Sequence, residues 1–211
     1  MELFLVRHGE SRNNTLPRSH HLPDPPLTEL GRLQVAQLAR ADLWTALRPQ
    51  RILSSPLWRA MATAAPLAAR LGVPWQVWAD LAEVHRSHPG DGQPVTELAA
   101  AFPEAEFEPG IHWPDQSGDE DPEGAVARAR RVVARVASLA GVDRVALVGH
   151  GGFGQYLVRA WLGAPQDGSV ELLQDNTAVH QLRFAHGRVV LVRFNDTAHL
   201  APALGAAAAG G

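Results

Sequence analysis

The stretch Leu3-Phe4-Leu5-Val6-Arg7-His8-Gly9-Glu10 changes from apolar to polar at its midpoint. A short apolar run that ends at charged residues and glycine is typical of a buried strand, which carries its polar neighbours to the edge of a sheet. The same pattern recurs in Arg51-Ile52-Leu53-Ser54 and in Arg144-Val145-Ala146-Leu147-Val148, which Gly149-His150-Gly151-Gly152 follows. We therefore expect a largely parallel sheet that binds its ligand beyond the carboxyl ends of these strands.

Helical patterns separate the predicted strands. The clearest begins after Asp121, a residue that can cap a helix, and its apolar residues recur every three or four positions up to Gly141. Further helices are predicted from Thr28 to about Leu47, from Leu57 to Leu71 and, briefly, from Glu97 to Ala101. Strands that alternate with helices indicate a three-layer α/β domain, in which helices flank both faces of a largely parallel sheet.

The remaining segments differ in composition from this core. Residues Thr177–Phe184 and Arg188–Phe194 are rich in strand formers and are joined by Ala185-His186-Gly187, which predicts a hairpin. Residues 85–121 are rich in proline, glycine, histidine and acidic groups, and we expect them to form an inserted lid or rim. The prediction is a single domain over residues 1–202 with a flexible tail at 203–211.

The overall composition excludes several classes of protein. Of the 211 residues, 45% are hydrophobic and 19% are charged, and the formal net charge is -3. These values are typical of a soluble globular protein without a surface for nucleic acid or an anionic membrane. The absence of cysteine excludes disulfides, thiolate metal sites and cysteine nucleophiles. The apolar run after Met1 is too short for a signal peptide or a membrane span, so a cytoplasmic location is expected. The sequence leaves open whether the protein forms a homodimer.

Cationic side chains gather at the predicted carboxyl edge of the sheet. Arg7 and His8 follow the first strand. Arg59 comes just after the second strand, and His150 follows the strand at residues 144–148. Each of these residues alone is more simply explained as a surface or structural group, but glycines beside both histidines let the backbone approach a ligand closely. Two guanidinium groups match phosphate oxygens, so the group as a whole predicts an anionic ligand.

A wider set of motifs shares one order and spacing along the chain: Arg7-His8-Gly9-Glu10-Ser11 with Asn14, Leu27-Thr28 before Gly31, Ser55-Pro56-Leu57 before Arg59-Ala60 and Thr63-Ala64, Glu83, and Gly149-His150-Gly151-Gly152. This set resembles the histidine phosphatase superfamily, whose best-known branch is cofactor-dependent phosphoglycerate mutase. The run Asn195–Leu200 also resembles the closing segment of small phosphatases in this group. The resemblance implies a phosphoglycerate mutase-like fold.

The resemblance implies that His8 becomes phosphorylated while Arg7, Arg59 and His150 hold the phosphoryl oxygens. Two guanidinium groups and an imidazolium stabilise charge on those oxygens without a metal ion or another cofactor. Imidazole is a competent nucleophile when a hydrogen bond to one ring nitrogen keeps the other neutral. We expect a backbone carbonyl to accept that bond from His8.

The resemblance also implies supporting residues around the phosphoryl group. Ser11, Asn14 and the backbone at Gly151 assist in binding phosphate. Glu83 protonates the leaving alkoxide and then, as a carboxylate, draws a proton from the attacking water. Asp80 is the nearby alternative for this role. The expected ligand is a small phosphorylated metabolite.

Three interpretations from other classes are weaker. Gly149–Gly154 fits the G-x-G-x-x-G pattern of dinucleotide-binding proteins, but that pattern normally opens the first βαβ unit of a domain. The chain contains no G-x-S-x-G, which disfavours a serine hydrolase. His20-His21 and His85-Arg86-Ser87-His88 lack the partnered carboxylates of a recognisable metal site.

Within the superfamily, the alternatives are a phosphoglycerate mutase and a non-catalytic relative that binds phosphorylated ligands. The non-catalytic alternative is disfavoured because nucleophile, cationic residues and acid are all present. A mutase rebinds a highly anionic bisphosphate, for which it needs basic residues over the site. The only Arg or Lys between Glu83 and Glu123 is Arg86, beside nine acidic residues, Asp91, Glu97, Glu104, Glu106, Glu108, Asp115, Asp119, Glu120 and Asp121. We therefore predict a phosphatase for a monoester that is small or has a neutral or positive leaving group.

Overall fold

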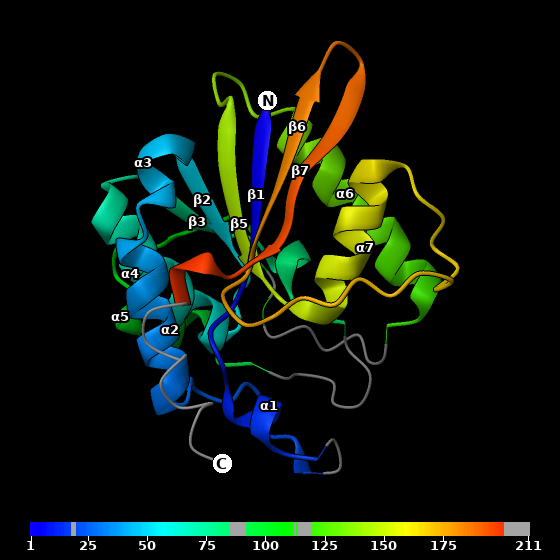
Figure 1. The fold of residues 1–211 in the computed structure, drawn as a ribbon. Coiled ribbons are helices and arrows are strands. Elements are labelled where there is room, and N and C mark those ends of the chain that lie inside the picture. The colour runs from blue at the N-terminus through cyan, green and yellow to red at the C-terminus, as the bar shows by residue number, and fades with distance from the viewer. Residues whose placement is uncertain (18–19, 85–91, 112, 114–119, 201–211) are drawn as a thin grey trace, which may run out of the picture.

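The computed structural model describes residues 1–17, 20–84, 92–111, 113 and 120–200. These residues form an α/β fold around a seven-stranded sheet with the order β4-β3-β2-β5-β1-β6-β7 (Figure 1). The first five strands in this order run parallel, and β6 and β7 add an antiparallel hairpin at one edge. The strands are β1 (Glu2–Arg7), β2 (Arg51–Ser54), β3 (Trp75–Val77), β4 (Glu106–Phe107), β5 (Arg144–Gly149), β6 (Val179–Ala185) and β7 (Arg188–Asp196).

Helices cover both faces of this sheet, as the alternation of strand and helix patterns predicts (Figure 1). One face carries α2, α3, α4 and α5, and the other carries α6 and α7. Two short 3-10 helices, η2 (Ala79–Leu81) and η3 (Ala198–Leu200), follow β3 and β7. The helices are α1 (Arg12–Thr15), α2 (Glu29–Arg40), α3 (Leu43–Leu47), α4 (Trp58–Leu71), α5 (Val95–Ala101), α6 (Pro122–Ala137) and α7 (Gly151–Leu162).

The interior strand β1 contributes to two hydrophobic cores, one on each face of the sheet. Phe4 and Val6 pack with α2 to α5, whereas Leu3 and Leu5 pack with α6 and α7. Successive side chains on a strand point to opposite faces, so an unbroken apolar run is what a strand covered on both sides requires. Each of these side chains is 5% exposed or less, and burying one contributes about 1.5–3 kcal/mol to the hydrophobic free energy of folding.

The prediction of a single helix from Thr28 to Leu47 is wrong, because the helix is interrupted in its middle. The chain forms two helices, because Ala41 adopts an extended conformation with ψ of 133° between α2 and α3. The resulting turn brings Trp44 back onto α2, where its indole N–H donates to Leu38 O at 2.7 Å. Burial of Trp44 and Leu47 in the core outweighs the helical propensity of the connecting residues.

Helix α6 begins as the sequence predicts and ends earlier. Asp121 caps it by accepting the backbone N–H of Gly124 at 2.6 Å, and Pro122 occupies its first turn. The helix stops at Ala137, before the expected end near Gly141, and Gly141 adopts a positive φ of 71° in the following turn. The glycine therefore serves the turn after the helix and not the helix end itself.

The expected hairpin is present as β6 and β7. Its loop is two residues long, because Ala185 pairs with Arg188 across His186 and Gly187. Both loop residues have positive φ, 51° and 71°, which is the requirement of a type I′ turn. The hairpin tip lies at the opposite end of the sheet from the carboxyl ends of β1 and β5 (Figure 1).

The described part of the expected insertion at residues 85–121 contributes to the core. Strand β4 pairs with β3 at the edge of the sheet, and α5 buries Leu98 completely. Residues 85–91, 112 and 114–119 lie outside the described residues, as does the expected tail at 203–211, so the lid or rim stays a prediction. Among the helices that the structure describes, none is long and apolar enough to cross a membrane.

Candidate active site

The polar loops that follow β1, β2 and β5 meet at one edge of the sheet. In the parallel register, Arg7 pairs with Gly149 and Ser54 pairs with Val148. The ladder continues past the strand ends, since His8 N–H donates to Gly149 O at 2.9 Å and Ser55 N–H donates to Val148 O at 3.0 Å. Parallel pairing thus brings together residues that are far apart in the sequence.

His8 is buried, and its side chain is oriented by its own loop. The Nδ1 atom lies 2.6 Å from Gly9 O, so Nδ1 carries the proton and Nε2 keeps its lone pair. Burial, followed by the charges of Arg59 and Arg7, holds the pKa of His8 well below its ordinary value. The imidazole is therefore neutral, with Nε2 available as a nucleophile and a backbone carbonyl in the expected role.

The loop that carries His8 is held against α2 and α4. Gly9 N–H donates to Thr63 Oγ1 at 3.1 Å, and Thr63 in turn donates to Arg59 O at 2.8 Å. A Cβ atom at Gly9 would lie only 2.8 Å from Gly31 O, so a side chain there would push the loop away from α2. Close backbone contact is the reason for glycine beside His8.

Arg59 comes from the first turn of α4 and points at His8. Its Nε–H lies 3.3 Å from His8 Nε2. Asp24 fixes this geometry from a loop that precedes α2, because each of its carboxylate oxygens accepts Trp58 N–H at 2.8 Å and Oδ1 lies 3.5 Å from Arg59 Nη1. A carboxylate at a helix N-terminus is electrostatically favourable, and here it also orients a guanidinium.

His150 lies beside His8, with 5.1 Å between the ring centroids. Its Nε2 is 2.7 Å from Ser55 Oγ, and Ser55 Oγ also accepts the N–H of Leu57 at 3.2 Å. The expected imidazolium is not what the unliganded site holds, because burial and the nearby charge of Arg59 keep the pKa of His150 well below its ordinary value. A phosphoryl dianion would supply the negative charge that favours protonation.

Arg7 is the second guanidinium of the site. Its Nη1 donates to Gln174 O. Burial lowers the pKa of Arg7, the charges of Glu83 and Asp175 oppose this shift, and an arginine stays protonated regardless. Within the described residues, Arg7 Nε and His150 Nδ1 are buried without a hydrogen-bond partner. A buried N–H without a partner, such as that of Arg7 Nε, is costly unless a ligand pairs with it, and an anion would do so.

Glu83 and Asp80 make different contacts. The carboxylate of Glu83 accepts backbone N–H groups from the first turn of α7, next to Arg7. Asp80 instead binds Arg131 and Arg135 on α6, each at 3.1 Å. Of the two acids considered, Glu83 therefore lies beside the buried cations, and its part in proton transfer stays a prediction.

Ser11 and Asn14 form a small polar network near His8. Asn14 Oδ1 accepts both Ser11 N–H at 2.9 Å and Ser11 Oγ–H at 3.1 Å. Asn176 joins them, since its Nδ2 donates to His8 O at 2.9 Å and lies 3.4 Å from Asn14 Oδ1. Asn176 reaches this position from the segment before β6.

Sequence reasoning missed Asp24 and Asn176. Asp24 stands shortly before the Leu27-Thr28 motif, and Asn176 just before the β-rich segment. An isolated acid or amide in a loop has no pattern of its own. The one usable signal was that a buried Arg59 needs a carboxylate partner.

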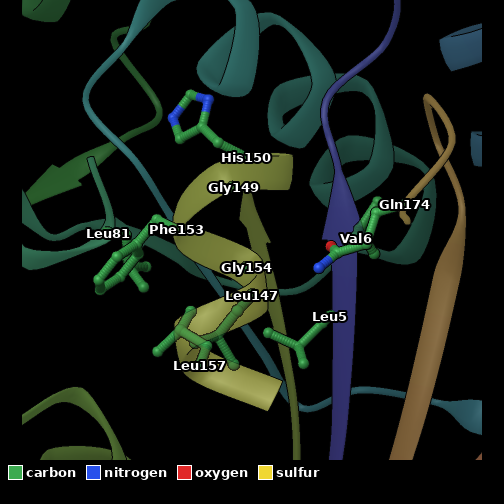
Figure 2. A pocket seen from close by; sticks show the side chains of 10 residues that line it. All are labelled: Leu5, Val6, Leu81, Leu147, Gly149, His150, Phe153, Gly154, Leu157 and Gln174. Carbon is green, nitrogen blue, oxygen red and sulfur yellow. The ribbon is translucent and has the colours of Figure 1, made fainter. Parts of the chain in front are cut away.

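A small cavity lies under the first turns of α7, between this helix and strands β1 and β5 (Figure 2). Figure 2 shows the amide of Gln174 turned toward its apolar lining. The cavity has a volume of about 10 Å³, which has room for one water at most. This volume is far below the volume of a ligand pocket. This cavity is therefore too small to hold a substrate. The lining residues are Leu5, Val6, Leu81, Leu147, Gly149, His150, Phe153, Gly154, Leu157 and Gln174.

Comparisons with known proteins place the chain in a family. The family model of the histidine phosphatase superfamily (branch 1) matches residues 3–197. Glucosyl-3-phosphoglycerate phosphatase of Mycolicibacterium vanbaalenii is 35% identical over 179 residues, which are 78% of this chain and 76% of the relative. Among solved structures, mycobacterial hydrolase 1 superposes with a TM-score of 0.67 at 29% identity, covering 92% of this chain and 97% of that one. The mycobacterial glucosyl-3-phosphoglycerate phosphatase with VO3 gives a TM-score of 0.65 at 28% identity, with coverage of 92% and 98%. The chain belongs to the histidine phosphatase superfamily.

Proposed function

We propose that this protein is a metal-independent phosphatase that hydrolyses a phosphate monoester through a phosphohistidine on His8. The observation that carries the proposal is the state of His8, which is a buried neutral imidazole. Its Nδ1–H donates a hydrogen bond to Gly9 O. Arg59 Nε lies 3.3 Å from its Nε2 atom, the ring centroid of His150 lies 5.1 Å from that of His8, and the charge of Arg7 acts on His8 as well. Phosphoryl transfer asks a protein for positioning and for charge stabilisation, which this arrangement supplies.

In the first half-reaction, His8 Nε2 attacks phosphorus and the bond between phosphorus and the ester oxygen breaks. Arg59 turns its N–H groups from His8 Nε2 to the phosphoryl oxygens, and Arg7 and His150 bind the same group. Glu83, in its acid form, gives its proton to the leaving oxygen, so the product is a neutral alcohol. Ser11, Asn14 and the Gly151 N–H support the phosphoryl group.

In the second half-reaction, water attacks phosphorus and the bond to Nε2 breaks. The electron pair returns to His8, and the carboxylate of Glu83 takes the proton of the attacking water. The products are inorganic phosphate, neutral His8 and protonated Glu83, which is ready for the next ester. The backbone carbonyl of Gly9 keeps its bond to Nδ1 throughout, so the ring does not need to turn.

The comparisons favour a phosphatase over the mutase alternative. The similar proteins reported above are named as phosphatases or as a hydrolase. A mutase would return the phosphoryl group to a second acceptor, whereas in a phosphatase water takes it. Phosphate release without added 2,3-bisphosphoglycerate separates these two functions.

The substrate we propose is a small phosphorylated metabolite, and glucosyl-3-phosphoglycerate is the first to test because a relative is named for it. This compound carries a carboxylate, which the expected acidic rim would disfavour. In the structure, however, Glu108 pairs with Arg135, Glu120 pairs with Arg128, and Asp121 caps α6. These three acids are neutralised or used locally, so they do not form a repulsive rim. Asp91, Asp115 and Asp119 lie outside the described residues.

The decisive experiment compares the wild type with His8→Ala and a matched control, His186→Asn. His186 lies at the hairpin tip with a positive φ that asparagine tolerates. Phosphate release is measured with EDTA present on glucosyl-3-phosphoglycerate, phosphoserine and para-nitrophenyl phosphate. We expect loss of activity only in His8→Ala. Retained hydrolysis in that variant would refute the phosphohistidine mechanism, and inactivity of the wild type on all substrates would favour a phospholigand-binding protein.

A homodimer, a cytoplasmic location and the absence of nucleic-acid partners stay predictions. Strand β7 forms one edge of the sheet, and four consecutive apolar residues on it, Val189 to Val192, are 36% to 47% exposed. Exposed apolar edge strands favour association. Light scattering on the purified protein measures the oligomeric state directly, and a monomeric mass would contradict the dimer.

A further inference from the structure

The carboxylate of Glu83 sits on the N-terminus of α7. Oε1 accepts Phe153 N–H at 2.6 Å and Val84 N–H at 2.9 Å, and Oε2 accepts Gly152 N–H at 3.1 Å. Gly152 and Phe153 are in the first turn of the helix, where backbone N–H groups carry partial positive charge. Glu83 is thus held as an acceptor of three hydrogen bonds.

Gly152 provides the space that this arrangement needs. A Cβ atom at Gly152 would lie 2.6 Å from Oε1 of Glu83 and 3.0 Å from its Cδ. The backbone at Gly152 is not in the left-handed region, so conformation alone does not demand glycine here. Glycine is also a poor helix former. Glycine at position 152 therefore serves to let the Glu83 carboxylate approach the helix backbone closely.

The two half-reactions of the proposed mechanism need opposite forms of Glu83. Formation of the phosphohistidine uses the acid form as a proton donor, whereas its hydrolysis uses the carboxylate as a proton acceptor. The three N–H groups fix where the carboxyl group lies beside Arg7. Both half-reactions therefore depend on the place that these contacts set.

We propose that Gly152 is a positioning residue that lets the carboxyl group of Glu83 lie on the N-terminus of α7, the place from which it moves protons in the proposed mechanism. The inference rests on the proposed function, because it presupposes a phosphohistidine on His8. It predicts that displacing this carboxyl group from α7 slows hydrolysis of the phosphohistidine, because the attacking water then lacks a placed proton acceptor.

The test is rapid quenching of phosphohistidine in wild type and Gly152→Ala, with para-nitrophenyl phosphate as the substrate. This ester has a good leaving group, so the first half-reaction proceeds without much help from an acid. An alanine Cβ displaces the carboxylate from α7. General-base assistance is then impaired, and we expect the phosphohistidine to live about tenfold longer or more, with a burst of para-nitrophenol before steady turnover.

Two further variants separate this effect from damage to the fold. Gly124→Ala is the matched control, because Gly124 also lies in the first turn of a helix and also donates its N–H to a carboxylate, that of Asp121. It should leave the phosphohistidine lifetime at the wild-type value. Glu83→Asp retracts the carboxylate without adding an atom beside α7, and it should lengthen the lifetime as Gly152→Ala does.

The possible results distinguish failure of this inference from failure of the proposed function. A wild-type phosphohistidine lifetime in folded Gly152→Ala or in Glu83→Asp overturns the inference and leaves the phosphatase function standing. The same holds if Gly124→Ala lengthens the lifetime equally. Failure to trap label on His8 even in Glu83→Gln refutes the phosphohistidine itself, and with it the proposed function.

Discussion

Acidification should destabilise the native protein through His180, a histidine of β6 that lies outside the site. The side chain is fully buried, and its Nδ1 accepts the N–H of Asn195 at 2.9 Å. Burial lowers the pKa of His180 from 6.5 to about 4. The unfolded chain therefore takes up a proton below pH 6.5 that the native state takes up only near pH 4, and native stability falls across this window.

The size of the effect follows from the pKa difference. Each pH unit between the two pKa values changes the free energy of unfolding by about 1.36 kcal/mol. Between pH 6.5 and about pH 5, the contribution of His180 is therefore a loss of about 2 kcal/mol. His8 and His150 act in the same direction, because their pKa values are lowered too.

The assay is urea unfolding of wild type and His180→Gln across this pH range. Glutamine keeps an acceptor for Asn195 N–H but does not titrate. We expect its unfolding free energy to fall by about 2 kcal/mol less than that of the wild type between pH 6.5 and about pH 5. Equal pH dependence in the two proteins would show that His180 titrates normally in the native state.

Three further predictions concern the site and the core. Asp24→Ala removes the carboxylate that orients Arg59 and should raise KM and weaken vanadate inhibition, each by about tenfold, since a charge-assisted hydrogen bond contributes about 1.5–3 kcal/mol; unchanged vanadate affinity would contradict this role. Ser55→Ala removes the hydroxyl that orients His150 and should lower kcat more than it raises KM, which steady-state kinetics will show, whereas a change in KM alone would be against it. Leu98→Ala leaves a cavity in the core and should cost about 2–5 kcal/mol of stability in urea unfolding, with kcat unchanged at a temperature where the variant is folded.

The parallel core and its catalytic edge could be predicted from the sequence. Unbroken apolar runs that end in Arg7-His8 and in Gly149-His150 identify strands covered on both faces, with cations at their carboxyl ends. The rule that parallel strands share this edge then brings His8 and His150 together. The carbonyl partner of His8 Nδ1 was predicted as well, because a nucleophilic imidazole needs its other nitrogen held.

Other features needed the tertiary structure. The break at Ala41 depends on the burial of Trp44, which local propensity does not record. The pairing of Glu108 with Arg135 was not predicted, because a count of charges ignores the partners of each charge. The uncharged state of His150 is likewise a matter of burial among other cations.

The sequence by itself determined the fold class, the family and the cationic cluster around His8, since these follow from patterns that are local in the chain. Only the tertiary structure decided which groups those residues contact. It joined Asp24 to Arg59, tied Ser55 to His150 and laid Glu83 on the N-terminus of α7. These contacts link residues 35 to 95 positions apart, and pairing over such separations arises from packing, which no local pattern encodes.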